Sequence, residues 1–254
     1  MSREGIPVTP REAAENERFL QDRPRVPQQR YIKRHGILAR ITHDTVALCC
    51  IWLAFSGLFV FVPSLAAWAG ADAVFFMRMS HRVIGVVFVA VPLIAAIAAP
   101  RGVGHMVGSM TEKWDSDDKK WMKLFVPYLF MARWIHMPDQ REIKSGQRFA
   151  DGMILLLGIV MGLSGVGLLV DETILPLGLT AHGVLLFVHD LGFFGLTVFG
   201  LAHIFLGAGI FQPYRGTARL MFGDGYVSES DALYHWGHWA RKEIEDGKNV
   251  VEKE

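Results

Sequence analysis

The chain has 254 residues, of which 51% are hydrophobic, and its formal net charge at pH 7 is only +1. The two cysteines, Cys49 and Cys50, are adjacent, which excludes a disulfide framework, a C-x-x-C metal site and covalent haem attachment through C-x-x-C-H. We interpret them as small apolar residues of a helix bundle. No nucleic-acid partner is expected.

The apolar residues are gathered into runs that are almost free of charge. These runs are residues 45–71, 83–100, 152–170 and 173–214, the last interrupted only by Asp190. Each reaches the roughly 18 to 20 residues that a helix needs to cross about 30 Å of hydrocarbon. None has the polar face of a soluble core helix. The sequence therefore predicts an all-α integral membrane protein, a bundle of four transmembrane helices in contact with lipid.

Basic residues indicate how the bundle is oriented. They are frequent in residues 1–42, in the connection 101–148 and in the tail after 215, and sparse around 63–80 and 171–182. Positively charged loops stay in the cytoplasm. We expect a multi-pass protein of the bacterial inner membrane, with both termini and the central loop cytoplasmic.

The sequence divides into three expected parts. Residues 1–30 are a cytoplasmic arm, 31–214 form the four-helix membrane domain, and 215–254 form a cytoplasmic tail that looks helical from 229 to 245. The central loop combines basic with aromatic residues, which is typical of a segment in the headgroup layer. We find no internal repeat and no nucleotide-binding motif.

Four histidines at membrane depth carry the predicted chemistry. Ionisable residues there are costly and mark functional sites. His43 begins the first span on the cytoplasmic side, and His81 begins the second on the outer side. His189 and His203 lie on the fourth span, near its outer end and deeper toward the cytoplasm; their separation of about four turns places them on one helix face.

These depths give an outer pair, His81 with His189, and an inner pair, His43 with His203. Two bis-histidine sites on facing helices are what two haems require. We therefore predict two haem b groups, with the four histidines as iron ligands. A histidine that merely forms a hydrogen bond in the core is the alternative for any one of them, but it leaves the matched depths unexplained.

Cations are expected at the haem propionates. Arg78 and Arg82 lie close to His81, and Arg40 lies one turn before His43. His182 competes with His189 as the outer ligand but sits at the membrane edge. Asp190 is costly inside a span, and Arg82 is its expected partner. The remaining histidines are expected to be ordinary surface residues: His35, His105, His136, His235 and His238.

The sequence resembles the cytochrome b (gamma) subunit of membrane-bound, periplasm-facing formate dehydrogenases. The resemblance runs from about residue 34 to 245 and rests on R-I-T-H-D, F-M-R-M-S-H-R-V-I-G, S-G-Q-R, L-L-F-V-H-D, L-A-H-I-F and H-W-G-H-W-A-R-K-E-I. In that family the four matching histidines bind two b haems, and menaquinone is reduced beside the inner one. The resemblance implies a quinone site at Gly146, Gln147 and His203. The resemblance also places Lys144 at this site, where the family often has Asn.

The resemblance also implies partners. A molybdenum or tungsten subunit would oxidise formate, and an iron–sulfur subunit would pass electrons to the outer haem, then to the inner haem, and on to menaquinone or ubiquinone. Protons would come from the cytoplasm. The family further suggests a higher oligomer, a trimer of multi-subunit units.

Three other functions are alternatives. The same kind of cytochrome could serve a hydrogenase, a thiosulfate reductase or another molybdoenzyme, and the sequence separates these poorly. A proton or metal transporter would show broken helices, inverted repeats and carboxylates near the midplane, which are largely absent. A cofactor-free anchor leaves the paired histidines unexplained.

Overall fold

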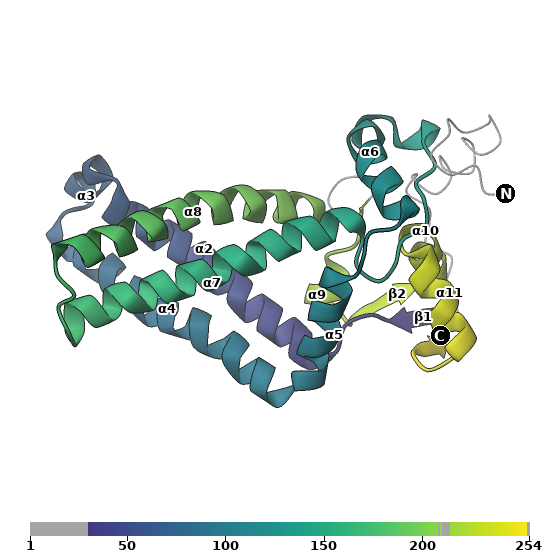
Figure 1. Cartoon of the computed structure of the whole chain (residues 1–254), viewed down its shortest axis with the longest axis horizontal. Coiled ribbons are helices and arrows are strands. Elements are labelled where there is room, and N and C mark those ends of the chain that lie inside the picture. Colours follow the sequence, from purple (N-terminus) through teal and green to yellow (C-terminus); the bar gives the residue numbers. More distant parts are fainter. Residues whose placement is uncertain (1–29, 208, 210–213, 253–254) are drawn as a thin grey trace. The chain divides into compact units, whose positions relative to one another are not determined.

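Four long apolar helices dominate the structure, a computed structural model that describes residues 30–207, 209 and 214–252 (Figure 1). They are α2 (Ile37–Phe61), α4 (Ala71–Ala98), α7 (Ser145–Thr173) and α8 (Leu179–Gly207), and each is long and apolar enough to cross a membrane. The predicted all-α membrane bundle is confirmed. The expected arm at residues 1–30 falls almost entirely outside the described residues.

The helices begin and end where backbone chemistry requires it. Pro63 cannot continue α2 and opens the short helix α3 (Pro63–Ala69), and Gly70 then turns the chain with φ +84°. The predicted spans differ from the helices because freedom from charge does not define a helix end. The first run merged α2 with α3, and the helices α2 and α4 include polar residues such as Arg40 and Arg82.

The chain forms two compact units. Residues 37–103 and 153–202 make up the membrane unit, and the described residues of 30–36, 104–152 and 203–252 make up the second unit. The first turns of α7 and the last residues of α8 thus belong to the second unit. Each unit is described by itself.

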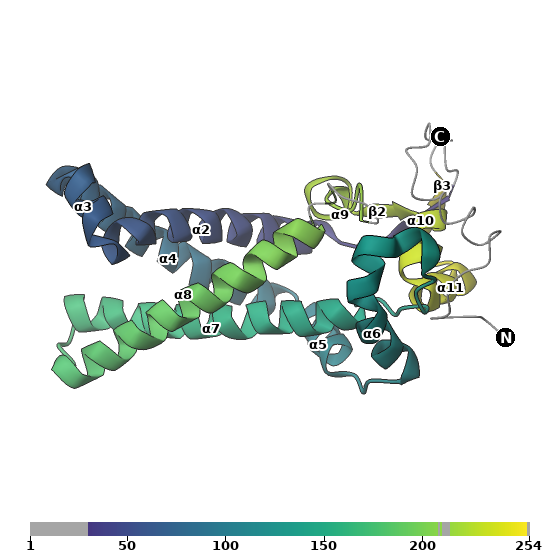
Figure 2. The ribbon, with the colours of Figure 1, turned by 90° about the horizontal axis from the view of Figure 1, so that it is seen from above.

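In the membrane unit, side chains link each helix to the next. α2 packs on α4 through Trp52 and Phe76, whose ring centres lie 6.5 Å apart. α4 meets α7 through the ion pair of Arg82 with Glu172. α7 and α8 run beside each other in both views (Figure 2), and α8 returns to α2 through Phe61 and Phe194, 5.6 Å apart. Large apolar side chains elsewhere stay exposed, as lipid-facing residues do.

The membrane unit contains an internal repeat, which corrects our expectation of none. α7 begins 108 residues after α2, and α8 begins 108 residues after α4. Gly70 and Gly178, separated by the same interval, both precede the second helix of a hairpin with φ values of +84° and +87°. α2–α4 and α7–α8 are therefore equivalent hairpins.

The second unit holds the polar connections. Its elements are β1 (Arg30–Lys33), α5 (Pro100–Thr111, of which the first four residues belong to the membrane unit), α6 (Ser116–Met131), η1 (Ala132–Trp134), α9 (Arg219–Phe222), β2 (Tyr226–Ser228), α10 (Glu229–His235), α11 (Gly237–Asp246) and β3 (Val250–Glu252). The strands form an antiparallel sheet in the order β2-β1-β3, with Ile32 facing Val227 and Val250 in the register. Trp236 and Trp239 pack with Ile32 in its core. The expected helical tail is present as α10 and α11.

Candidate haem-binding site and its surroundings

His81 and His189 face each other inside the membrane unit. His81 is the eleventh residue of α4, and His189 is the eleventh residue of α8. Their ring centres lie 6.3 Å apart, and the ring planes make an angle of 70°. The structure thus brings together the two residues predicted as the outer pair.

Each of these imidazoles lies at hydrogen-bond distance from a serine of the first long helix of its hairpin, α2 for His81 and α7 for His189. Ser56 Oγ lies 3.0 Å from His81 Nδ1, and Ser164 Oγ lies 2.9 Å from His189 Nδ1. Both hydroxyls donate their proton to a carbonyl four residues back, Ser56 to Trp52 at 2.8 Å and Ser164 to Val160 at 2.7 Å. The serine oxygens therefore accept the Nδ1–H of each ring, and Nε2 keeps its lone pair.

A glycine beside each serine makes room for the ring. A Cβ built at Gly57 would lie 3.3 Å from His81 Cε1, and one at Gly165 would lie 3.3 Å from His189 Cε1. These approaches are tighter than ordinary van der Waals contact. The absence of a side chain lets both imidazoles lie against a helix backbone.

The spacing of the two rings suits a pair of residues that would hold one haem iron between them. Metal–imidazole bonds are about 2 Å long, and the ring centre lies about 1 Å behind the nitrogen, so two rings on opposite sides of one metal have centres about 6 Å apart. The observed 6.3 Å agrees. Within the described ranges no group of three metal-ligating side chains occurs.

The comparison with protein families agrees with this chemistry. The model described as prokaryotic cytochrome b561 matches residues 34–224, about three quarters of the chain. The chain belongs to the prokaryotic cytochrome b561 family. It is therefore a prokaryotic membrane cytochrome of the b type that acts in electron transfer. A search of the curated proteins finds no match.

In this cytochrome the two histidines predicted for the inner haem fall in different units. His43, on α2, lies with Nδ1 3.1 Å from Asp44 Oδ1. His203, on α8, lies with Nδ1 3.0 Å from Asp151 Oδ1 of α7. A carboxylate on Nδ1 can orient an imidazole that binds a metal. The pairing of His43 with His203 stays a prediction.

The residues predicted for the quinone site gather at the start of α7. The backbone N–H of Lys144 donates to Gln147 Oε1 at 3.4 Å, and a Cβ at Gly146 would overlap the Trp121 ring. Gln147 lies one turn before Asp151, the partner of His203, so these residues share a helix face. Their role in binding quinone stays a prediction.

Lys144 has surroundings that the sequence did not indicate. It is 5% exposed, and its Nζ lies 3.2 Å from His235 Nδ1 and 4.5 Å from the centre of the Tyr214 ring. Burial, and secondly the guanidinium of Arg34, hold the pKa of this amine well below its usual range. His235 was expected at the surface but is 9% exposed. Its place between Tyr234 and Trp236, in an aromatic stretch of the tail, was the available signal.

Other predicted polar partners differ in the structure. Arg82 pairs with Glu172, where Asp190 was expected, because α7 rather than α8 brings a carboxylate to it. His182, the competing outer ligand, lies with Nδ1 2.7 Å from Asp171 Oδ2. Arg78 is exposed on α4. The roles of Arg40, Arg78 and Arg82 toward haem propionates stay predictions.

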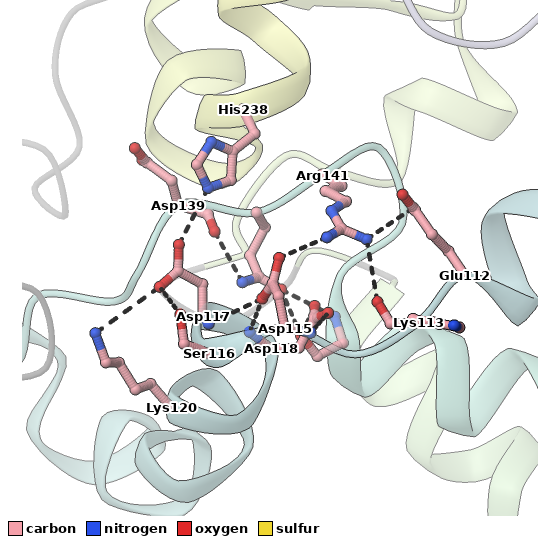
Figure 3. A network of polar contacts seen from close by, with 12 residues as sticks. Glu112, Lys113, Asp115, Ser116, Asp117, Asp118, Lys120, Asp139, Arg141 and His238 are labelled. Atoms are coloured by element: carbon pink, nitrogen blue, oxygen red, sulfur yellow. Dashed lines mark hydrogen bonds and ion pairs between the residues drawn. The ribbon is translucent and has the colours of Figure 1, made fainter.

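A polar network fixes the segment that leads into α7 (Figure 3). Asp118 forms a capping box with Asp115 at the start of α6 and an ion pair with Arg148 of α7 at 2.6 Å. Ser145 Oγ lies 2.8 Å from both Asp118 Oδ1 and Gln140 Oε1. Asp118 thereby ties α6 to the segment that carries the predicted quinone residues.

Asp118→Ala is expected to lower the free energy of unfolding of the second unit by about 3–5 kcal/mol, since it leaves a buried guanidinium without its partner. The side chains of Asp118 and Arg148 are only 5% and 2% exposed. Thermal unfolding of the detergent-solubilised chain, followed by tryptophan fluorescence, measures the loss. Lys120→Ala is the control, because its pair with Asp117 is half-exposed at Lys120 and is worth about 0–1 kcal/mol. Equal midpoints for the two variants would contradict the expectation.

Proposed function

We propose that the chain is the dihaem cytochrome b subunit of a formate dehydrogenase complex. In this proposal His81 and His189 hold the outer haem, and His43 and His203 hold the inner one. The haems supply one-electron transfer, from a periplasmic iron–sulfur subunit toward menaquinone or ubiquinone on the cytoplasmic side. Formate is oxidised on a separate molybdenum or tungsten subunit. The chain lies in the inner membrane with both termini cytoplasmic.

The facing imidazoles of His81 and His189 carry the proposal. Their 6.3 Å separation suits one iron between them, and the serine bonds leave both Nε2 atoms free to bind it. The equivalent hairpins supply one imidazole each. The two hairpins cross the membrane in the same direction in this proposal. The alternative, a proton or metal transporter, would be built from inverted repeats and broken helices.

The polar start of α7 supports a quinone site in the second unit. A buried amine at Lys144, the amide of Gln147 and the imidazole of His203 are donors of the kind that bind a quinone oxygen. Burial lowers the pKa of the Lys144 amine well below its usual range, which suits a group that exchanges protons during quinol formation.

A reduced-minus-oxidised absorbance spectrum of the purified chain tests the cofactor assignment. We expect the bands of b haem and about two haems per chain by extraction. A chain purified without haem from cells that make haem proteins normally would overturn the proposal.

Purification of the native complex tests the partners. We expect an iron–sulfur chain and a chain that holds molybdenum or tungsten to copurify, with formate-dependent reduction of both haems and a mass that indicates several copies of the complex. Reduction by hydrogen or by another donor, with formate inactive, would assign the same cytochrome to a hydrogenase, a thiosulfate reductase or another molybdoenzyme.

A further inference from the structure

Ser56 and Ser164 are equivalent residues of the internal repeat. The interval from α2 to α7 is 108 residues, and the same interval separates Ser56 from Ser164, Gly57 from Gly165 and His81 from His189. Each serine–histidine bond also joins residues 25 positions apart. The two hairpins therefore present one module twice, a serine and a glycine on the first helix and a histidine on the second.

Both serines are buried, and the hydroxyl proton of each is donated to a backbone carbonyl. Ser56 is 0% exposed and Ser164 is 3% exposed. A helical serine can satisfy its hydroxyl with the carbonyl one turn back, as both do here, and needs nothing more. That both oxygens also meet an imidazole Nδ1 at hydrogen-bond distance is a second, independent feature, and it occurs in both hairpins.

We propose that Ser56 and Ser164 are positioning residues for the haem held by His81 and His189, setting the tautomer and the ring plane of each ligand. This inference rests on the proposed function. Neither serine would contact the iron. Each acts through the imidazole whose Nδ1–H it accepts.

Two measurable properties follow from these bonds. An acceptor on Nδ1–H makes an imidazole a better electron donor, which stabilises the oxidised iron and lowers its reduction potential. The bonds also hold the rings at 70°, far from parallel. Steeply crossed axial imidazoles give a highly anisotropic low-spin ferric signal in electron paramagnetic resonance, whereas parallel planes give an ordinary rhombic one.

The test compares Ser56→Ala and Ser164→Ala with Ser80→Ala in the full-length protein. Ser80 precedes His81 on α4, but its hydroxyl donates to the Met77 carbonyl at 3.1 Å and, among the residues that the structure describes, to no imidazole. We expect each of the first two variants to raise the midpoint potential of one haem only and to change its paramagnetic signal. We expect haem to dissociate about 10- to 100-fold more readily, and the double variant to show the larger effect. Ser80→Ala should match the wild type.

The outcomes separate this inference from the proposed function. Unchanged potentials and signals in both Ser56→Ala and Ser164→Ala, with haem bound, would overturn the role of the serines and leave the haem assignment intact. A wild-type chain that binds no haem would overturn the proposed function itself. Because Ser56 and Ser164 are equivalent positions, one variant still tests the role of the serines if the other does not insert into the membrane. Ser56→Thr keeps the hydroxyl and should have the wild-type potential.

Discussion

His203→Ala is expected to remove the inner haem and spare the outer one. His203 is a proposed ligand of the inner iron, and its imidazole is oriented by Asp151 at 3.0 Å. Loss of one of two axial ligands leaves the iron open on one side and weakens haem retention. We expect extracted haem to fall from two per chain to about one, and the remaining haem to keep its midpoint potential.

His189→Ala provides the mirror experiment. It should remove the outer haem, the one whose potential responds to the Ser56 and Ser164 variants, and spare the inner one. His182→Ala is the matched control, because His182 lies on the same helix but is engaged by Asp171 at 2.7 Å. Two haems retained in His203→Ala, or one haem lost in His182→Ala, would show that the pairing is wrong.

Much of the membrane unit was predictable from sequence, because lipid imposes simple rules. A span must be long, apolar and helical, so the four runs predicted the four helices. The cost of ionisable groups at depth singled out His81 and His189, whose rings the structure places next to each other with their centres 6.3 Å apart. The helix ends were less predictable, because Pro63 and Gly70 break a continuous apolar run that the absence of charge cannot divide.

The parts that were missed depend on tertiary contacts. The repeat is carried by helix positions and a few residues such as Gly70 and Gly178, while most equivalent positions differ in sequence. The serines look like ordinary small residues of a span until their hydroxyls are seen against the imidazoles. The sheet of β1, β2 and β3 joins strands of three or four residues from opposite ends of the chain, and no local pattern predicts that pairing.

Lys144→Met is expected to stabilise the second unit at neutral pH while slowing quinone reduction. The amine is buried beside His235, and across the part of the chain that the structure describes no carboxylate pairs with it. Its pKa in the folded protein lies well below the usual value, mainly because of burial. In the unfolded chain the amine regains its ordinary pKa of about 10.4 and binds a proton that the folded state lacks.

The sign of the pH dependence follows from that difference. Between the lowered folded pKa and the unfolded one, the unfolded state binds more protons, so the stability of the wild type rises as pH increases through this window. Lys144→Met removes that slope. We expect the unfolding midpoint of the variant to exceed that of the wild type at pH 7 and the two to converge toward pH 10, as measured by tryptophan fluorescence in detergent. Lys248→Met is the control, because Lys248 is exposed.

The rate of quinone reduction should fall while the unfolding midpoint rises. Lys144→Met removes the buried amine, and with it a group that exchanges protons. With haem content unchanged, we expect the rate of quinol oxidation or quinone reduction to fall about 10²- to 10⁴-fold, the range typical of a lost general acid–base group. Lys144→Met with a wild-type rate would remove Lys144 from the proton step. A fall in rate with no gain in midpoint would show instead that the amine is charged in the folded protein, held by a partner such as the His235 imidazole at 3.2 Å.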